Sequence, residues 1–409
     1  IGRLVGSEMC IRDRHNTNEK KLERKQMLEG KQPSGCQYCW NIECMGKDYV
    51  SDRHIKSTSI HTPERIEEIK SNPWDYDINP EYIEINFSNE CNFKCGYCHP
   101  KFSTRYYNEI KQHGPYKNVT AHSNNIDWFE LYEEDNNPYL EAWWKWWPEV
   151  SKTLNILRVT GGEPLMHKST WRLFEELKSN PKPHLNIELN SNMGVKEKLV
   201  KKLVATLKEL KETNAINSFK LYTSIDTWGP RASYTRTGLD IAVWERNLDY
   251  YLTQTGWPVT FMVTFNLFAV TSFNKLLEKI LEWRHKYNHN EQSKWQRIRF
   301  DTPYLRDPIQ FDMNILPKEK FMPYMKKHLQ FMHDYQDDTD RTKFSSLEVE
   351  KFRRVVDYME NTVYDKEKLL KGRKNFYNFF TQYDSRRNIK LTEVFPELEN
   401  FYMSCATQE

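Results

Sequence analysis

Three closely spaced cysteines constrain this chain more than any other feature. Cys91, Cys95 and Cys98 lie in NECNFKCGYCHP with a C-x3-C-x2-C spacing. A loop of three thiolates suits three irons of a four-iron cluster and leaves the fourth iron open, whereas a closed structural zinc site requires a fourth ligand. Residues 81–89, just before the loop, alternate polar and apolar side chains, which predicts a strand. We therefore expect the cysteines at the carboxyl end of a first strand, where parallel α/β barrels carry their active sites.

The composition excludes several other classes of protein. Aromatic residues make up 14% of the chain, which argues against disorder. The 60 basic and 57 acidic residues give a net charge of +3, so there is no electrostatic case for a nucleic-acid or membrane surface. No apolar run approaches the length of a membrane span, and no signal-peptide core is visible. We expect a soluble cytoplasmic protein, in whose reducing compartment clustered cysteines favour metal or cluster ligation over disulfides.

A glycine-rich segment follows the cysteine loop at a distance. The sequence ILRVTGGEPLMH contains Gly161 and Gly162, where the absence of side chains lets the backbone approach a ligand closely. Glu163 offers an acceptor for an ammonium group. Taken alone, the GGEP tetrapeptide is equally compatible with an ordinary strand-to-helix turn.

Two further segments end predicted strands in polar residues. IELNSNMG includes Asn190, and KLYTSIDTWGPRASYTRTGLD includes Ser224 and Arg236. A guanidinium fork is a natural partner for a carboxylate. In isolation, Asn190 could be a turn former, Arg236 a solvated charge at the start of a helix, and Asp226 an N-cap.

Together these segments resemble the radical S-adenosylmethionine (SAM) superfamily. The shared features are the C-x3-C-x2-C loop after the first strand, Tyr97 before its last cysteine, and a GGEP motif after the second strand, in the order that the superfamily uses. The segment at residues 220–240 resembles the peptide-modifying branch of the superfamily.

The resemblance implies both cofactors and roles. Cys91, Cys95 and Cys98 would ligate a [4Fe–4S] cluster, whose open iron would take SAM for reductive cleavage to a 5′-deoxyadenosyl radical that abstracts a substrate hydrogen. The two glycines and Glu163 would hold the amino end of SAM, Ser224 its ribose and Arg236 its carboxylate. The implied SAM contacts are Tyr97, Gly161, Gly162, Glu163, Asn190, Ser224 and Arg236. An electron donor such as flavodoxin or ferredoxin is implied as a partner, and a peptide or protein as the substrate, with a sugar or nucleotide as the alternative.

A second cysteine group lies upstream, in GCQYCWNIECMGKDYVSDRH. Its C-x2-C pair, Cys36 and Cys39, is compatible with half of a zinc ribbon, with unpaired thiols, or with ligands of an auxiliary Fe–S cluster. The segment resembles twitch or SPASM-type radical SAM proteins of phages and marine bacteria, in which E-x2-G and S-x-R follow the pair. The corresponding residues here are Glu43, Gly46, Ser51 and Arg53. We expect Cys44 to be a weaker candidate ligand and Cys405 a bystander.

Alternating short strands and amphipathic helices from about residue 81 to 304 predict a partial (β/α)6 TIM-like barrel. The expected strands cover residues 83–87, 156–159, 185–190, 219–224, 259–265 and 297–301, and a helix is expected at 196–210. The expected domains are 1–14, a sequencing-adapter artefact that replaces the true N-terminus; 15–75, a truncated auxiliary-cluster segment; 76–306, the barrel; and 307–409, a helical extension.

Two features leave alternatives open. Trp143, Trp146 and Trp147 share one face of a predicted helix, which is expected to pack into the protein, with a stacking platform over the substrate as the alternative. A non-catalytic four-cysteine zinc module would explain both C-x2-C pairs through Cys36, Cys39, Cys95 and Cys98. It would leave Cys91 and the GGEP segment unexplained.

Overall fold

The computed structural model describes residues 15–44, 51, 53–54, 63–120, 126–127, 131, 134–287 and 296–407. The proposed adapter segment at 1–14, together with Gly46, lies outside these residues. Within the described part of the chain, no helix is both long enough and apolar enough to cross a bilayer.

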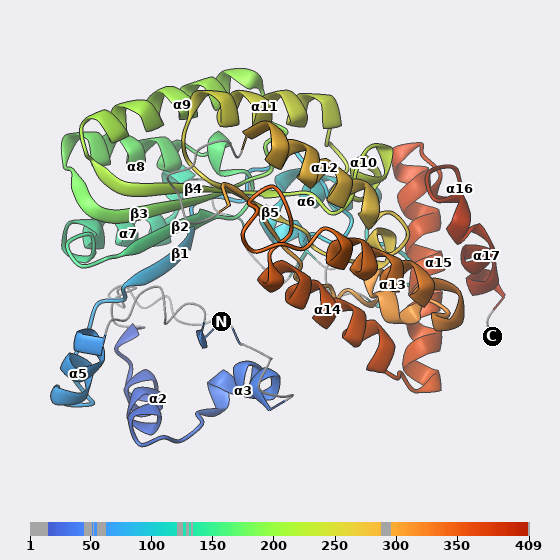
Figure 1. The fold of residues 1–409 in the computed structure, drawn as a ribbon, viewed down its shortest axis with the longest axis horizontal. Helices are drawn as coiled ribbons and strands as arrows, with labels where there is room; N and C mark the ends of the chain where they lie inside the picture. The colour runs from blue at the N-terminus through green and yellow to red at the C-terminus, as the bar shows by residue number, and fades with distance from the viewer. Residues whose placement is uncertain are drawn as a thin grey trace. The chain divides into compact units, whose positions relative to one another are not determined.

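A six-stranded sheet with strands in sequential order forms the centre of the fold (Figure 1). Parallel register is explicit where Leu221 of β4 (Ile216–Ser224) lies opposite Val259 of β5 (Val259–Met262), and where Val259 lies opposite Ile298 of β6 (Ile298–Asp301). The strands are β1 (Tyr82–Asn86), β2 (Ile156–Thr160), β3 (Lys182–Ser191), β4 (Ile216–Ser224), β5 (Val259–Met262) and β6 (Ile298–Asp301). The predicted partial (β/α)6 TIM-like fold is confirmed, with each of the six expected strands present at shifted ends.

Alternation along the strands explains which face of the sheet the helices cover. Leu157 and Val159 of β2 are fully buried, as are Ile187 and Leu189 of β3. Figure 1 shows α8 (Lys168–Ser179), α9 (Glu197–Glu212) and α11 (Ile241–Gln254) along one side of the strands. On that side the indole N–H of α11 residue 244 donates to the Thr223 hydroxyl of β4 at 3.1 Å. The intervening positions on β2 and β3 are polar or half-buried.

Helices account for much of the rest of the described chain, and the predicted helical extension is confirmed. Those before and within the barrel are α2 (Asn18–Leu28), α3 (Gln37–Glu43), α5 (Pro63–Ser71), α6 (Thr104–His113), α7 (Pro138–Val150), α10 (Pro230–Thr235) and α12 (Phe273–Tyr287). Those after the barrel are α13 (Lys318–Asp334), α14 (Ser346–Asn361), α15 (Lys366–Arg387), α16 (Leu391–Val394) and α17 (Glu399–Ala406).

The C-terminal helices share a core with the barrel. Phe352 of α14 lies 5.6 Å from Phe265, which follows β5, and 5.0 Å from Phe273 of α12, measured between ring centroids. Arg284 of α12 and Glu348 of α14 form a buried ion pair at 2.6 Å. These contacts make the extension part of the wall that encloses β5 and β6.

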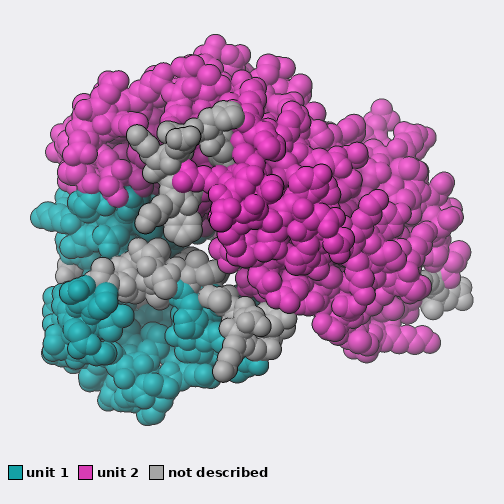
Figure 2. All heavy atoms as spheres, in the orientation of Figure 1, with its two compact units in different colours: residues 1–84, 135–157, 184–186 teal, residues 85–134, 158–183, 187–409 magenta. Residues whose placement is uncertain are grey.

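The chain divides into two compact units, coloured separately in Figure 2. One comprises residues 1–84, 135–157 and 184–186, and the other comprises the remainder. The expected domain boundaries at residues 75 and 306 rest on the order of motifs along the chain and not on contacts between residues. They stay predictions.

The tryptophan-rich segment is α7, in the first unit. Trp143, Trp146 and Trp147 are at most 4% exposed, and the rings of Trp143 and Trp147 lie 5.4 Å apart. Burial of this face favours the packing interpretation over an exposed stacking platform.

Candidate active site

The cysteine loop lies directly after β1, as the sequence predicts. Cys91 is buried, while Cys95 and Cys98 are half-buried. The Cys91 sulfur accepts hydrogen bonds from the Phe93 backbone N–H at 3.4 Å and from Asn192 Nδ2 at 3.9 Å. Among the described residues, no group of three or more His, Cys, Asp or Glu side chains meets in a metal-binding arrangement. The three thiols are nevertheless close enough to act on one another electrostatically.

The electrostatics of the three thiols fit a group that brings positive charge. Burial, followed by the nearby Cys95 thiolate, raises the pKa of the Cys91 thiol, and the same two causes raise the pKa of Cys98 to about 12. Three thiolates in this loop would repel one another without positive charge between them. Iron ions supply such charge, and hydrogen bonds to the sulfurs are a recognised feature of cluster sites. The residues present therefore fit the implied [4Fe–4S] cluster.

A short backbone ladder holds the middle of the loop. The N–H of Lys94 donates to the carbonyl of Thr237 at 2.8 Å, and the N–H of Gly96 donates to the carbonyl of Thr235 at 3.0 Å. These two bonds flank Cys95 on one side of the ladder and Arg236 on the other. A Cβ on Gly96 would lie 2.8 Å from the ring of Phe311, so glycine fits best at this point.

The glycine turn after β2 docks on the start of the cysteine loop. Gly161 and Gly162 both have positive φ, at +77° and +38°, which disfavours any residue with a side chain. A Cβ on Gly162 would lie 2.3 Å from the carbonyl oxygen of Glu90, which also accepts the Glu163 N–H at 2.7 Å. The turn therefore contacts the residue that precedes Cys91.

Glu163 has a role inside the protein that the sequence did not indicate. Its side chain is fully buried, and its carboxylate accepts hydrogen bonds from Ser191 Oγ at 2.8 Å and from the Asn192 N–H at 2.6 Å. Burial raises its pKa to about 7, against the opposing effect of these bonds. The resemblance implies that Glu163 accepts the ammonium group of SAM. In the structure, its carboxylate connects the turn after β2 to the end of β3 through hydrogen bonds.

Arg236 likewise has a different partner from the one that the resemblance implies. It is 5% exposed rather than solvated, and its fork is engaged by Asp226, with Nε–Oδ2 at 3.1 Å and Nη2–Oδ1 at 2.8 Å. Asp226 also accepts the Tyr97 hydroxyl at 2.6 Å and the Thr264 N–H at 3.0 Å. It is not the N-cap of the helix that follows, α10, whose N-cap is Gly229. Because the fork already holds a protein carboxylate, it is not free for the carboxylate of SAM in this arrangement.

The same buried cluster reaches the cysteines. Burial raises the pKa of the Cys95 thiol, while the positive charge of Arg236 opposes that rise. Desolvation also raises the pKa of Tyr97, so its hydroxyl stays protonated and donates to Asp226. Asp226 thus links the cysteine loop to the ends of β4 and β5. The signal for it in the sequence is an acid placed just after a strand, in YTSID.

The remaining two predicted SAM contacts lie at carboxyl ends of strands. Ser224 is the last residue of β4 and is half-buried. Asn190 accepts a hydrogen bond from Arg158 Nε at 2.9 Å, so its carbonyl oxygen already has a partner. Asn192, two residues beyond Asn190 in the same polar segment, contacts both the Cys91 sulfur and Asn92, the latter at 2.8 Å.

The upstream cysteine group forms its own ordered arrangement in the first unit. Arg53 pairs with Glu43 at 2.7 Å and lies 4.0 Å from the Trp40 ring centroid, and Ser51 donates to the same carboxylate. The described members of the E-x2-G and S-x-R motifs thus meet. Arg53 also interacts electrostatically with the two C-x2-C thiols at 36 and 39, both half-buried.

The other two described cysteines are Cys44, expected to be a weaker candidate ligand, and Cys405, expected to be a bystander. Cys44 is exposed at the end of α3. Cys405 is buried in α17, far along the chain from either cysteine group.

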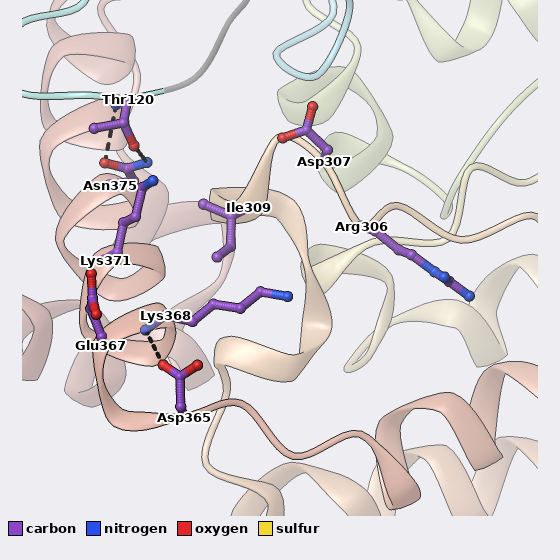
Figure 3. A pocket seen from close by; sticks show the side chains of 9 residues that line it. All are labelled: Thr120, Arg306, Asp307, Ile309, Asp365, Glu367, Lys368, Lys371 and Asn375. Atoms are coloured by element: carbon purple, nitrogen blue, oxygen red, sulfur yellow. Dashed lines mark hydrogen bonds between the residues drawn. The ribbon is translucent and has the colours of Figure 1, made fainter.

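A pocket of about 510 Å³ opens between the segment that follows β6 and the start of α15 (Figure 3). Figure 3 shows the Lys368 side chain extending from α15 toward this segment, near Ile309. Charged groups of both signs line the pocket, together with the hydrogen-bonded pair Thr120 and Asn375. Two residues beyond Ile309, the Phe311 ring makes an edge contact with the cysteine loop, 5.6 Å from the ring at position 97.

Comparisons with known proteins find limited similarity. No family model matches the chain. A 123-residue stretch is 24% identical to GTP 3′,8-cyclase of Nautilia profundicola, covering 30% of this chain and 31% of that enzyme, so the match spans less than a third of the curated relative. A solved structure, native anSMEcpe with bound AdoMet and Kp18Cys peptide, has a TM-score of 0.37 and 17% identity, over 64% of this chain and 63% of its own. The similarity to the cyclase is confined to this stretch of the chain.

Proposed function

We propose that this protein is a radical SAM enzyme. The observation that carries the proposal is the arrangement around the cysteine loop. The Gly161–Gly162 turn docks before Cys91, Asn192 contacts the Cys91 sulfur, and the 235–237 segment pairs with both neighbours of Cys95. Segments that follow β2 and β3, and the end of α10, thereby contact the loop that carries the three thiols, which a scaffold for a zinc module would not require.

The cofactors supply the difficult chemistry. When bound, a [4Fe–4S] cluster and SAM provide reductive cleavage to a 5′-deoxyadenosyl radical. The chain's own residues hold the thiols in place and present polar groups at the strand ends. Ser224 suits the ribose, because its hydroxyl lies at the carboxyl end of β4. An electron donor such as flavodoxin or ferredoxin is part of the proposal.

Replacing Cys95 by alanine tests the assignment directly. After anaerobic reconstitution we expect the wild-type chain to form 5′-deoxyadenosine from SAM and dithionite, and Cys95→Ala to form none and to lose the core iron. Cys405→Ala, at a buried cysteine far along the chain, is the matched control and should behave as wild type. Deoxyadenosine formation by Cys95→Ala would remove these cysteines as the ligands, and zinc without iron in the wild type would favour the zinc module.

For the substrate we propose a peptide or protein. The support is the resemblance of residues 220–240 to the peptide-modifying branch and the mixed charge of the pocket in Figure 3, which suits a polar chain. A nucleotide is the second candidate, since the curated relative acts on GTP by its name. Stimulation of deoxyadenosine formation by GTP, but not by a peptide mixture, would decide for the nucleotide.

We also propose that Cys36 and Cys39 contribute to an auxiliary Fe–S cluster. The support is the ordered Glu43–Arg53 pair, with Arg53 acting on both thiols. Two clusters of up to four irons each would give about seven or eight irons per chain, and the double variant Cys36→Ala/Cys39→Ala would retain about four. An iron content near four in both proteins would refute the auxiliary site and leave the core proposal intact.

A further inference from the structure

One face of the sheet carries charge where a parallel sheet would ordinarily be apolar. Strands of α/β folds are usually buried on both faces and read as continuous hydrophobic runs. Here β2, β3, β4 and β6 alternate instead, and most positions opposite the helix-covered face are polar and half-buried. These positions include Arg158, Thr160, Glu188, Asn190, Lys220, Tyr222, Ser224, Arg299 and Asp301.

Three cations from three strands gather on this face. Arg158 of β2 lies 4.2 Å from the ring centroid of Tyr222, and the ammonium of Lys220 lies 4.9 Å from the same centroid. Arg158 and Arg299 of β6 both act on Lys220 as like charges. The gathering therefore spans β2, β4 and β6, with Tyr222 at its centre.

The carboxylate of Glu188, on β3, also contacts the group. Glu188 Oε1 accepts the Tyr222 hydroxyl at 3.2 Å and lies 3.5 Å from Lys220 Nζ. The Lys220 side chain is 28% exposed and that of Glu188 13% exposed, so both are removed from most of the solvent. Crowding three cations in a part-buried place is electrostatically costly. Such a group of cations favours the binding of an anion that forms hydrogen bonds with them.

We propose that Arg158, Lys220 and Arg299 form the site that binds an oxyanion group of the substrate, a phosphate or a carboxylate. Guanidinium groups hold either oxyanion with two hydrogen bonds, and an ammonium adds a point charge. Tyr222 and Glu188 orient the donors. This inference rests on the proposed function only in that the ligand is the substrate of the proposed enzyme.

The position of the site along the strands fits this role. Lys220 and Ser224 lie on the same face of β4, four residues apart, which is roughly 13 Å at the rise of a strand. Arg158 is similarly placed on β2, three residues before the Gly161–Gly162 turn. A substrate anchored by its anionic end would extend toward the cysteine loop, at the carboxyl ends of the strands.

Calorimetric titration of the full chain tests the site without requiring turnover. Inorganic pyrophosphate and glutarate serve as phosphate and carboxylate probes, at ionic strength matched with sodium chloride. We expect the wild type to bind at least one probe and Lys220→Met to bind it at least about tenfold more weakly, since a charge-assisted contact is lost. Lys220→Arg should restore binding. Lys198→Met, at an exposed lysine on α9, removes the same charge elsewhere and should change nothing.

The outcomes separate this inference from the proposed function. Preference for pyrophosphate would identify a phosphorylated substrate, and preference for glutarate an acidic peptide or another carboxylate. Equal binding by wild type and Lys220→Met, or no binding of either probe, would overturn the site. Deoxyadenosine formation without added substrate is measured on the same proteins. A wild type that forms none would refute the enzyme proposal, whereas anion binding would be unaffected.

Discussion

At the scale of single residues, the buried pair of Arg236 and Asp226 changes the role expected for Arg236. The resemblance assigns Arg236 to the carboxylate of SAM, but the structure gives its fork to Asp226 and places it opposite Cys95 in the backbone ladder. A cation beside a cluster thiolate stabilises the reduced, more negative cluster. Arg236 is therefore better explained as a positioning residue for the loop.

Replacement of Arg236 by glutamine distinguishes the two roles. We expect lower iron retention and a more negative reduction potential of the cluster, because a positive charge near Cys95 is removed and Asp226 loses its ion-pair partner. Redox titration followed by EPR measures the potential, and Arg236→Lys should recover it in part. If the potential is unchanged and SAM binds about tenfold more weakly or worse, Arg236 binds the cofactor carboxylate instead.

At the scale of elements, Glu163 ties the turn after β2 to the end of β3. Its carboxylate is fully buried, and its pKa of about 7 lies above the ordinary 4.5 chiefly because burial disfavours the charge. The folded chain therefore keeps this proton at pH values where the unfolded chain has lost it. Stability from this group is present below about pH 4.5 and declines as the pH rises to 7.

Glu163→Gln should remove this pH dependence. We expect the difference in the free energy of unfolding between wild type and variant to shift by about 3 kcal/mol against the wild type between pH 4.5 and 7. Urea denaturation of the cluster-free chain at both pH values measures it. Glu175→Gln, at an exposed position on α8, is the control. A pH-independent difference would show that Glu163 ionises normally in the fold.

At the scale of the whole molecule, the helical extension is part of the barrel wall. Arg284 donates to the carbonyls of Ile298 and Lys343 and pairs with Glu348, with no exposed surface of its own. Glu348 also closes the capping box of α14 with Ser345. The extension and β6 should therefore unfold together.

Glu348→Gln is expected to destabilise this unit as a whole. Leaving the buried Arg284 charge without its carboxylate should cost about 3 kcal/mol, visible as a lower midpoint of one shared transition by tryptophan fluorescence and far-UV circular dichroism. Glu393→Gln, in an exposed pair with Lys390, should leave the midpoint unchanged. Two separated transitions in the variant would mean that the extension folds independently of the barrel.

Local patterns along the chain were enough to predict the fold class and the cysteine loop. Short apolar stretches between helical patterns marked all six strands, and the loop spacing marked Cys91, Cys95 and Cys98, because both signals depend only on near neighbours in sequence. The partners of the other site residues came from the folded structure alone. Arg236 pairs with Asp226 across the cysteine loop, and Glu163 braces two strands.

The cations on one face of the sheet show why such partners cannot be predicted from local sequence. Arg158, Lys220 and Arg299 lie on three different strands, and Lys220 is acted on by both arginines. Strand order and register set which side chains become neighbours across a sheet, and both depend on contacts between residues far apart in the chain. No local pattern in the sequence contains that information.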